Sequence, residues 1–207
     1  MKIWSDFYDY IMPDVPGCPL HAATFALRQS AIAFCEQSLA WRHNHPDIAI
    51  MAGTADYPFD PPEDTVVHVV TYAALDGKQI GVETDASRMR VENWRNQSGR
   101  PQYVLGRESA LRLVPRPDVD GTLTLEVALK PAPLASSVSD ELFNEWREAI
   151  VHGALARLML SPKKPYTNGQ LAQHHQQQAH IKAGQAGIHV ARDRTRAPLQ
   201  TSIMRRQ

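Results

Sequence analysis

The chain has 207 residues, of which 43% are hydrophobic, so it can bury a core as one domain or as one domain with a sizeable insertion. Its 22 basic and 22 acidic residues balance, which argues against a protein whose whole surface binds nucleic acid. No run of about 18 apolar residues and no signal-peptide segment is present, and Cys18 and Cys35 form no C-x-x-C motif, so we expect a soluble protein made in a reducing compartment.

The first long helix is predicted over residues 20–41, after a segment that is too rich in proline to be helical. Two apolar ridges with a spacing of seven residues run along this helix, on nearly opposite sides. A surface helix of a monomer needs only one such ridge. The second ridge therefore predicts a helix enclosed in a bundle or packed between its own subunit and a neighbour. The first ridge consists of Leu20, Leu27, Phe34 and Trp41, and the second of Phe25, Ile32 and Leu39.

Residues 46–133 have the pattern of a small, mainly antiparallel β unit. The β-branched segment 65–75 indicates a buried strand, and Asp76-Gly77 after it is a strong signal for a two-residue hairpin. A second pair of strands is predicted further along the chain, joined by a turn that contains proline and glycine. The predicted strands are 65–75, 78–84, 110–114 and 122–129, with turns at 56–62 and 116–121.

Helical spacing returns at about Asp140, where Ser139 or Asp140 can cap the helix, and Ser161-Pro162 ends it. The pair Gly153-Ala154 in this helix allows the close approach of another helix. A last helix is predicted over residues 168–190. Its apolar face is weak, so we expect it to pack on the earlier helices and to fray at Gly184 and Gly187.

The C-terminal residues 189–207 form a basic tail without core periodicity. Five arginines against one acid give this segment a net charge of about +4, which leaves about −4 for the rest of the chain. We therefore predict an α+β protein with a helical bundle core, an inserted small antiparallel β unit and an extended C-terminal tail. The predicted boundaries are 1–45 and 134–188 for the helical domain, 46–133 for the β insertion and 189–207 for the tail.

The sequence contains no catalytic motif for a hydrolase, a nucleotide-binding protein or a zinc protease, so we expect no enzyme, no cofactor and no metal site. The carboxylates Asp60 and Glu63 are better interpreted as part of a solvated turn than as an acid and base pair. Cys18 and His21 are not expected to form a catalytic dyad. The histidines at 174, 175 and 180 lack the spacing of metal ligands and indicate a polar helix face or a subunit interface.

Two segments are candidates for binding a polyanion. One is a surface of aromatic and arginine side chains that could stack on single-stranded nucleic acid, although a solvated loop with its aromatic side chains packed inward is favoured. The other is the basic tail, for which we favour a groove on a protein partner, because apolar residues alternate with the arginines. The first segment contains Trp94, Arg95, Arg100, Tyr103 and Arg107.

The order of these segments resembles phage head-to-tail adaptor proteins, also called neck or tail tubular proteins. The resemblance lies in the order of the motifs along residues 15–188 rather than in any one of them. It is carried by Glu36-Gln37-Ser38-Leu39-Ala40-Trp41, the proline-rich turn 56–64, the hairpin at Asp76-Gly77, Gly99-Arg100-Pro101-Gln102-Tyr103, the strand end 111–117, Lys130-Pro131 and the helix over 149–160.

The resemblance implies a structural virion protein that forms a dodecameric ring between the portal and the tail. Its partners would be the portal protein, neighbouring adaptor subunits and a downstream tail or nozzle protein, with passing contact to viral DNA and none to a membrane. It would reside in the virion neck, and in the host cytoplasm during assembly. A tail-completion or terminator protein and a nucleic-acid-binding accessory protein remain the alternatives.

Two sets of residues are predicted to make these contacts. The first, for docking on the portal or a neighbour, is Arg192, Arg194, Arg196, Leu199, Ile203, Met204, Arg205 and Arg206. The second, for packing between subunits, is Leu20, Leu27, Phe34 and Trp41.

Overall fold

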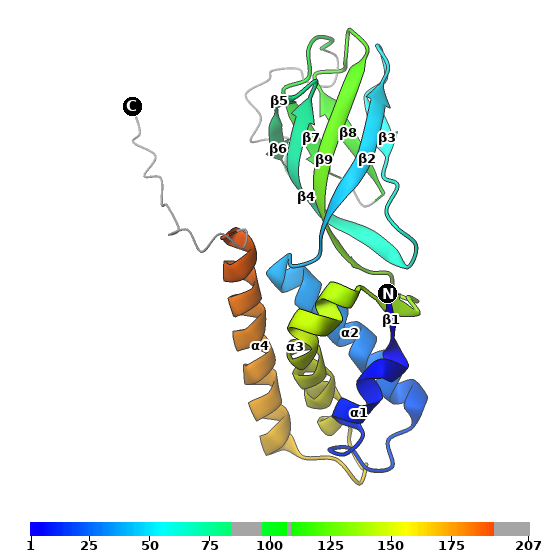
Figure 1. Ribbon diagram of the computed structural model, residues 1–207, viewed down its shortest axis with the longest axis vertical. Coiled ribbons are helices and arrows are strands. Elements are labelled where there is room, and N and C mark those ends of the chain that lie inside the picture. Colours follow the sequence, from blue (N-terminus) through cyan, green and yellow to red (C-terminus); the bar gives the residue numbers. More distant parts are fainter. Residues whose placement is uncertain (84–96, 107–108, 193–207) are drawn as a thin grey trace, which may run out of the picture. The chain divides into compact units, whose positions relative to one another are not determined.

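The computed structural model describes residues 1–83, 97–106 and 109–192 (Figure 1). The chain divides into two compact units. The helical unit contains residues 1–40 and the chain from Ser136 onward, and the β unit contains Trp41–Ala135. The β unit is therefore an excursion of the chain between two parts of the helical unit.

The helical unit is built on three long helices, α2, α3 and α4. Both α3 and α4 begin at a side-chain cap, because the hydroxyl of Ser139 accepts a hydrogen bond from the N–H of Leu142, and Asn168 Oδ1 accepts one from the N–H of Leu171, each at 3.1 Å. The elements are β1 (Lys2–Ile3), the 3-10 helix η1 (Trp4–Phe7), α1 (Tyr8–Ile11), α2 (Leu20–Ser38), β10 (Ser137–Val138), α3 (Asp140–Met159) and α4 (Gly169–Ala191).

Helix α2 is shorter than the predicted range 20–41. It ends at Ser38 because Leu39 has a left-handed backbone with φ of 54°, and its N–H still bonds to the carbonyl of Cys35 at 2.9 Å. Trp41 consequently belongs to the β unit and not to the helix. Helix α4 continues without a break through Gly184 and Gly187 to Ala191, so the predicted fraying at these glycines is not observed.

The core of the helical unit lies where α3 packs against both α2 and α4. Leu27 and Phe34 from α2 are buried there, and the Phe34 ring lies 5.9 Å from that of Trp146 on α3. Gly153 on α3 faces Ser30 on α2 so closely that an added Cβ would meet Ser30 Oγ at 2.1 Å. The expected close approach at Gly153 is confirmed, and it is an approach of α3 to α2.

The β unit contains two four-stranded sheets. One has the order β2-β9-β4-β5 and is antiparallel, and the other has the order β3-β8-β7-β6, in which β6 and β7 run parallel. The strands are β2 (Arg42–Ile50), β3 (Asp56–Pro58), β4 (Thr65–Leu75), β5 (Lys78–Gln79), β6 (Gly81–Glu83), β7 (Tyr103–Gly106), β8 (Ala110–Val114) and β9 (Gly121–Pro131).

The predicted strand 65–75 and its hairpin are confirmed. Asp76 and Gly77 both have positive φ, 50° and 74°, which suits a two-residue turn. The returning segment is split, since β5 stays in the first sheet while β6 joins the second. The predicted pairing of 110–114 with 122–129 was wrong, because β8 pairs with β3 and β7, whereas β9 pairs with β2 and β4.

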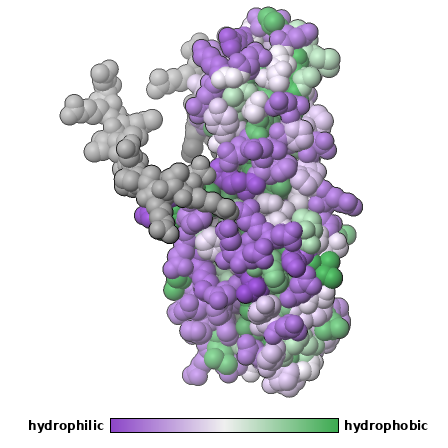
Figure 2. Space-filling model, in the orientation of Figure 1, coloured by the Kyte–Doolittle hydropathy of each residue, from purple (hydrophilic) through white to green (hydrophobic). Residues whose placement is uncertain are grey.

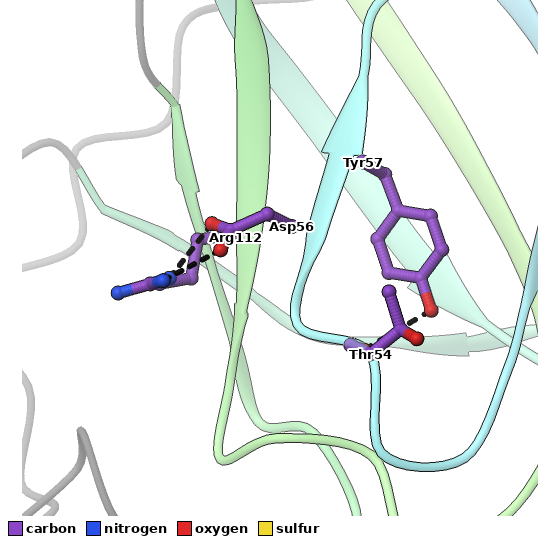
Figure 3. Close-up of polar contacts among 4 residues, drawn as sticks. All are labelled: Thr54, Asp56, Tyr57 and Arg112. Atoms are coloured by element: carbon purple, nitrogen blue, oxygen red, sulfur yellow. Dashed lines mark hydrogen bonds and ion pairs between the residues drawn. The ribbon is translucent and has the colours of Figure 1, made fainter.

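Strand β3 lies in the segment that was predicted to be a rigid turn. Arg112 on β8 forms two hydrogen bonds with the carboxylate of Asp56, at 2.8 and 2.5 Å, and the hydroxyl of Tyr57 donates to the carbonyl of Thr54 at 3.1 Å (Figure 3). The contact with Asp56 raises the pKa of Arg112. The contact of Asp56 with Arg112 holds the short strand against β8, and the Tyr57 hydroxyl ties it to the turn that precedes it.

The predicted helical bundle core with a small β unit was wrong. Ten strands in three sheets occur among the described residues, so the protein is a sheet-rich α+β protein. The β unit has a core of its own, which includes the fully buried side chains of Leu111, Leu123, Leu125 and Leu129. The sheets were underestimated because β2, with its histidines, proline and aspartate, does not have the composition of a strand.

Candidate subunit interface

Helix α2 exposes one residue of its second apolar ridge, Phe25, and the first residue of the other ridge, Leu20, whereas Ile32 and Leu39 are half-buried. Phe25 is 61% exposed and Leu20 is 55% exposed, whereas Leu27 and Phe34 are buried. At 100° per residue, Phe25 lies about 180° around the helix from Phe34. The helical unit therefore uses one side of α2 for its own core and leaves an apolar side chain on the other.

A groove of about 340 Å³ opens among α2, α3 and α4. Its walls come mainly from small side chains, which allow a hollow between packed helices. The small residues are Ala33, Ala149, Gly153, Ala156, Ala179 and Ala183, and Leu160, which is 59% exposed, adds an apolar lip.

Polar side chains surround this groove. They are Gln37 from α2, Arg157 from α3, and Gln176 and His180 from α4. His180 Nδ1 lies 3.3 Å from Gln37 Oε1, while Arg157 has no hydrogen-bond or ion-pair partner in the described part of the chain. An apolar floor with a polar rim is the anatomy of a protein interface.

The groove depends on the approach of α2 to α3. Ser30 donates a hydrogen bond of 2.7 Å to the carbonyl of Ile150, in the turn of α3 that precedes Gly153. The hydroxyl occupies the space that a side chain at position 153 would need. Ser30 and Gly153 thus set how closely the two helices can pack at the groove.

The outer face of α4 is almost free of formal charge. The one lysine of this helix, Lys182, forms an ion pair with Glu148 of α3 at 2.6 Å. Its exposed residues are otherwise glutamine, histidine and small or apolar side chains, including Leu171, Ile181 and Ile188, which are 46–53% exposed. Depletion of charge is typical of interface cores rather than of solvated helix faces.

The exposed apolar side chains of the helical unit are not gathered into one large patch on the face that Figure 2 shows, where hydrophobic groups lie scattered among hydrophilic ones. An interface of this unit would consequently combine separate faces of α2 and α4.

A pair of histidines lies where α3 packs on α4. The Nδ1 atoms of His152 and His175 are 2.8 Å apart, so one ring donates the hydrogen bond and the other accepts it. Burial lowers the pKa of both rings. The pKa of His152 is lowered further by His175, and that of His175 by His174. His175 was among the histidines singled out from the sequence, whereas His152 was not, since a long-range contact between helices is not encoded in local spacing.

The four predicted packing residues lie in different surroundings. Leu27 and Phe34 are 0% and 4% exposed and belong to the core of the helical unit, which accounts for them without a neighbouring subunit. Trp41 is buried and belongs to the β unit. Leu20 is exposed, so its side chain is accessible to a neighbouring subunit. Of the docking residues, Arg192 caps α4, and those from position 193 onward lie outside the described residues.

The side chains weighed as catalytic groups are not assembled into a site. Cys18 is buried while His21 is exposed, and no hydrogen bond joins them in the described part of the chain. Asp60 and Glu63 are both exposed, and the backbone N–H of Asp60 donates to Nε2 of the buried His45 at 2.8 Å. No group of three or more possible metal ligands occurs among the residues that the structure describes.

The candidate stacking surface can be followed only in part, because Trp94, Arg95 and Arg107 lie outside the described residues. Tyr103 is half-buried and packs on a small cluster of Leu105 and Val114. Its ring is therefore partly used within the β unit.

Comparison with known proteins gives the family. The model of the SU10 adaptor protein family matches residues 13–202, so the chain belongs to that family. This confirms the resemblance to phage head-to-tail adaptors and makes the chain a member of a phage structural family whose products act with other virion proteins. A search of curated proteins finds no match. No helix among the described residues combines the length and hydrophobicity of a bilayer span.

Proposed function

We propose that this protein is a non-enzymatic head-to-tail adaptor that forms a ring joining the portal to the tail of a phage particle. Membership of the SU10 adaptor family over residues 13–202 carries the proposal. The exposed apolar side chains of α2 and the uncharged face of α4 support it, because an assembly would cover surfaces that a monomer leaves in water. The balanced charge also suits a ring, in which like-charged subunits would repel one another.

The proposed partners are the portal protein, neighbouring adaptor subunits in a dodecamer, and the next tail or nozzle protein. The subunit would assemble in the host cytoplasm and reside in the virion neck, where viral DNA passes through the ring. The basic C-terminal residues 189–207 would dock on the portal or a neighbour. Arginines interleaved with Leu199, Ile203 and Met204 suit a groove on a protein better than a bare phosphate backbone.

Sedimentation of the purified protein with the portal from the same genome tests this function. We expect co-sedimentation with the portal at a fixed ratio of adaptor to portal subunits. Binding to tail tubes alone would favour a tail-completion protein instead. Binding to DNA alone, with a steep dependence on salt, would favour a nucleic-acid-binding accessory protein.

A further inference from the structure

We propose that the ring is closed by insertion of Phe25 of one subunit into the groove among α2, α3 and α4 of the next subunit. The inference rests on the proposed function, since it names the contact between neighbouring copies of this chain. The knob is Phe25, which at 61% is the most exposed large hydrophobic side chain among the described residues of the helical unit. The groove is the hollow of about 340 Å³ described above.

The knob and the groove face different directions on one subunit. Four residues of α2 line the groove, and Phe25 precedes all of them by at least five positions and lies on average about 130° around the helix from them: Ser30, Ala33, Phe34 and Gln37. Phe25 therefore cannot fill the groove of its own subunit. Two different patches on one chain that fit each other make a head-to-tail contact, and a head-to-tail contact whose rotation closes produces a ring.

The size of the groove suits an aromatic ring. A cavity of about 150 Å³ lined by apolar side chains is enough to bind benzene. The groove has about 340 Å³, so it has room for the ring of Phe25 and for part of the α2 backbone that carries it. Its small-residue walls let a second helix come close.

The exposed charge of α2 and the charge at the groove have opposite signs. The exposed residues of α2 are Leu20, His21, Phe25, Ala33, Glu36 and Gln37, so their one formal charge is that of Glu36, while Arg28, one turn beyond Phe25, is half-buried. The one formal charge among the residues that line the groove is that of Arg157, which has the opposite sign and no partner in the described part of the chain. A second copy of the chain thus brings an acid and an apolar knob to a groove with a basic rim.

The test uses two variants that each remove one half of the contact. Phe25→Ala removes the knob, and Ala33→Phe fills the groove from its exposed wall. Ile3→Ala is the matched control, because Ile3 is an apolar residue of the same unit that is 55% exposed and lies outside the groove and outside α2 and α4. Circular dichroism melts establish that each variant is folded. Mass photometry then measures assembly of the free protein, and electron microscopy measures ring occupancy on the portal.

We expect Phe25→Ala and Ala33→Phe each to weaken subunit association on the order of tenfold or more, and Ile3→Ala to behave like the unmodified chain. An equimolar mixture of the two interface variants should form a dimer and nothing larger. In that mixture, one intact knob meets one intact groove and no further contact is available.

The outcomes separate this contact from the proposed function. If the unmodified chain forms rings and Phe25→Ala forms them equally well, the contact is refuted and the adaptor function stands. Dimers of Phe25→Ala alone would equally overturn the head-to-tail arrangement. If the unmodified chain forms no ring, either free or on the portal, both proposals fail.

Discussion

Replacement of Gly153 by alanine would test the close approach of α2 to α3 that shapes the groove. In an open helix this change is stabilising by about 0.5–1 kcal/mol, because glycine loses more backbone entropy on folding. At position 153 the new Cβ would meet Ser30 Oγ at 2.1 Å and Ser30 Cβ at 3.2 Å. The hydroxyl must leave, so its 2.7 Å hydrogen bond to the carbonyl of Ile150 breaks.

The two costs exceed the entropic gain. An unsatisfied buried hydroxyl costs about 1–3 kcal/mol, and the tight contact between the two Cβ atoms adds about 1 kcal/mol or more of overpacking. We therefore expect Gly153→Ala to lower the free energy of unfolding of the helical unit by about 2 kcal/mol. Urea unfolding followed by far-ultraviolet circular dichroism measures this change.

Two further variants make the test specific. Gly184→Ala in α4 has nothing within 4 Å of its new Cβ, so it should stabilise the unit by about 0.5–1 kcal/mol. In a Ser30→Ala background, where the hydroxyl is absent, Gly153→Ala should cost less than about 0.5 kcal/mol. A Gly153→Ala variant as stable as Gly184→Ala, or a cost that persists without the Ser30 hydroxyl, would refute the reasoning.

Three other predictions follow from the helical unit. Because the pKa values of His152 and His175 are lowered from 6.5 in the fold, the folded state binds fewer protons than the unfolded state as the pH falls. The free energy of unfolding should have its full value above about pH 6.5 and decrease below it. His152→Gln should reduce the decrease in the free energy of unfolding at low pH. The other charged groups that act on the two histidines are unchanged in this variant; they are Glu148, Lys182, His174 and Asp14. Phe34→Ala should cost about 3–5 kcal/mol, whereas Phe25→Ala should change monomer stability by less than about 0.5 kcal/mol, and equal melting temperatures would contradict the assigned burial. Deletion of residues 193–207 should leave the melting curve unchanged and abolish co-sedimentation with the portal; a loss of cooperative melting would instead assign these residues to the fold.

Local signals were sufficient where the structure is locally determined. Strand β4 matches the predicted range 65–75, since a run of β-branched residues followed by Asp76-Gly77 has few other solutions. Ser139 caps α3 as predicted, because a cap needs only the neighbouring backbone. These elements are fixed by residues that are close together in the chain.

Features that depend on distant residues could not be predicted from one sequence. The buried His45 in β2 is satisfied by the backbone at both ring nitrogens, through the N–H of Asp60 and, at 2.7 Å, the carbonyl of Pro46. Without that knowledge a histidine argues against a buried strand. The pairing of β9 with β2 and β4, rather than with β8, likewise depends on the contacts of whole sheets.

The same distinction applies to the candidate interface. The two ridges of α2 predicted a helix with more apolar surface than a monomer needs, and Phe25 and Leu20 are the exposed parts of that surface. The sequence did not show which ridge would be used internally, because the choice depends on α3. The groove was not predictable either, since it is formed by small residues from three helices.

The most direct test of the adaptor function is electron microscopy of the purified protein mixed with the portal from the same genome, with the portal alone as the control. The proposal predicts a second ring stacked coaxially on the portal, and the images would count its subunits. Portals without a second ring, in a mixture where the protein is folded and in excess, would contradict the proposal.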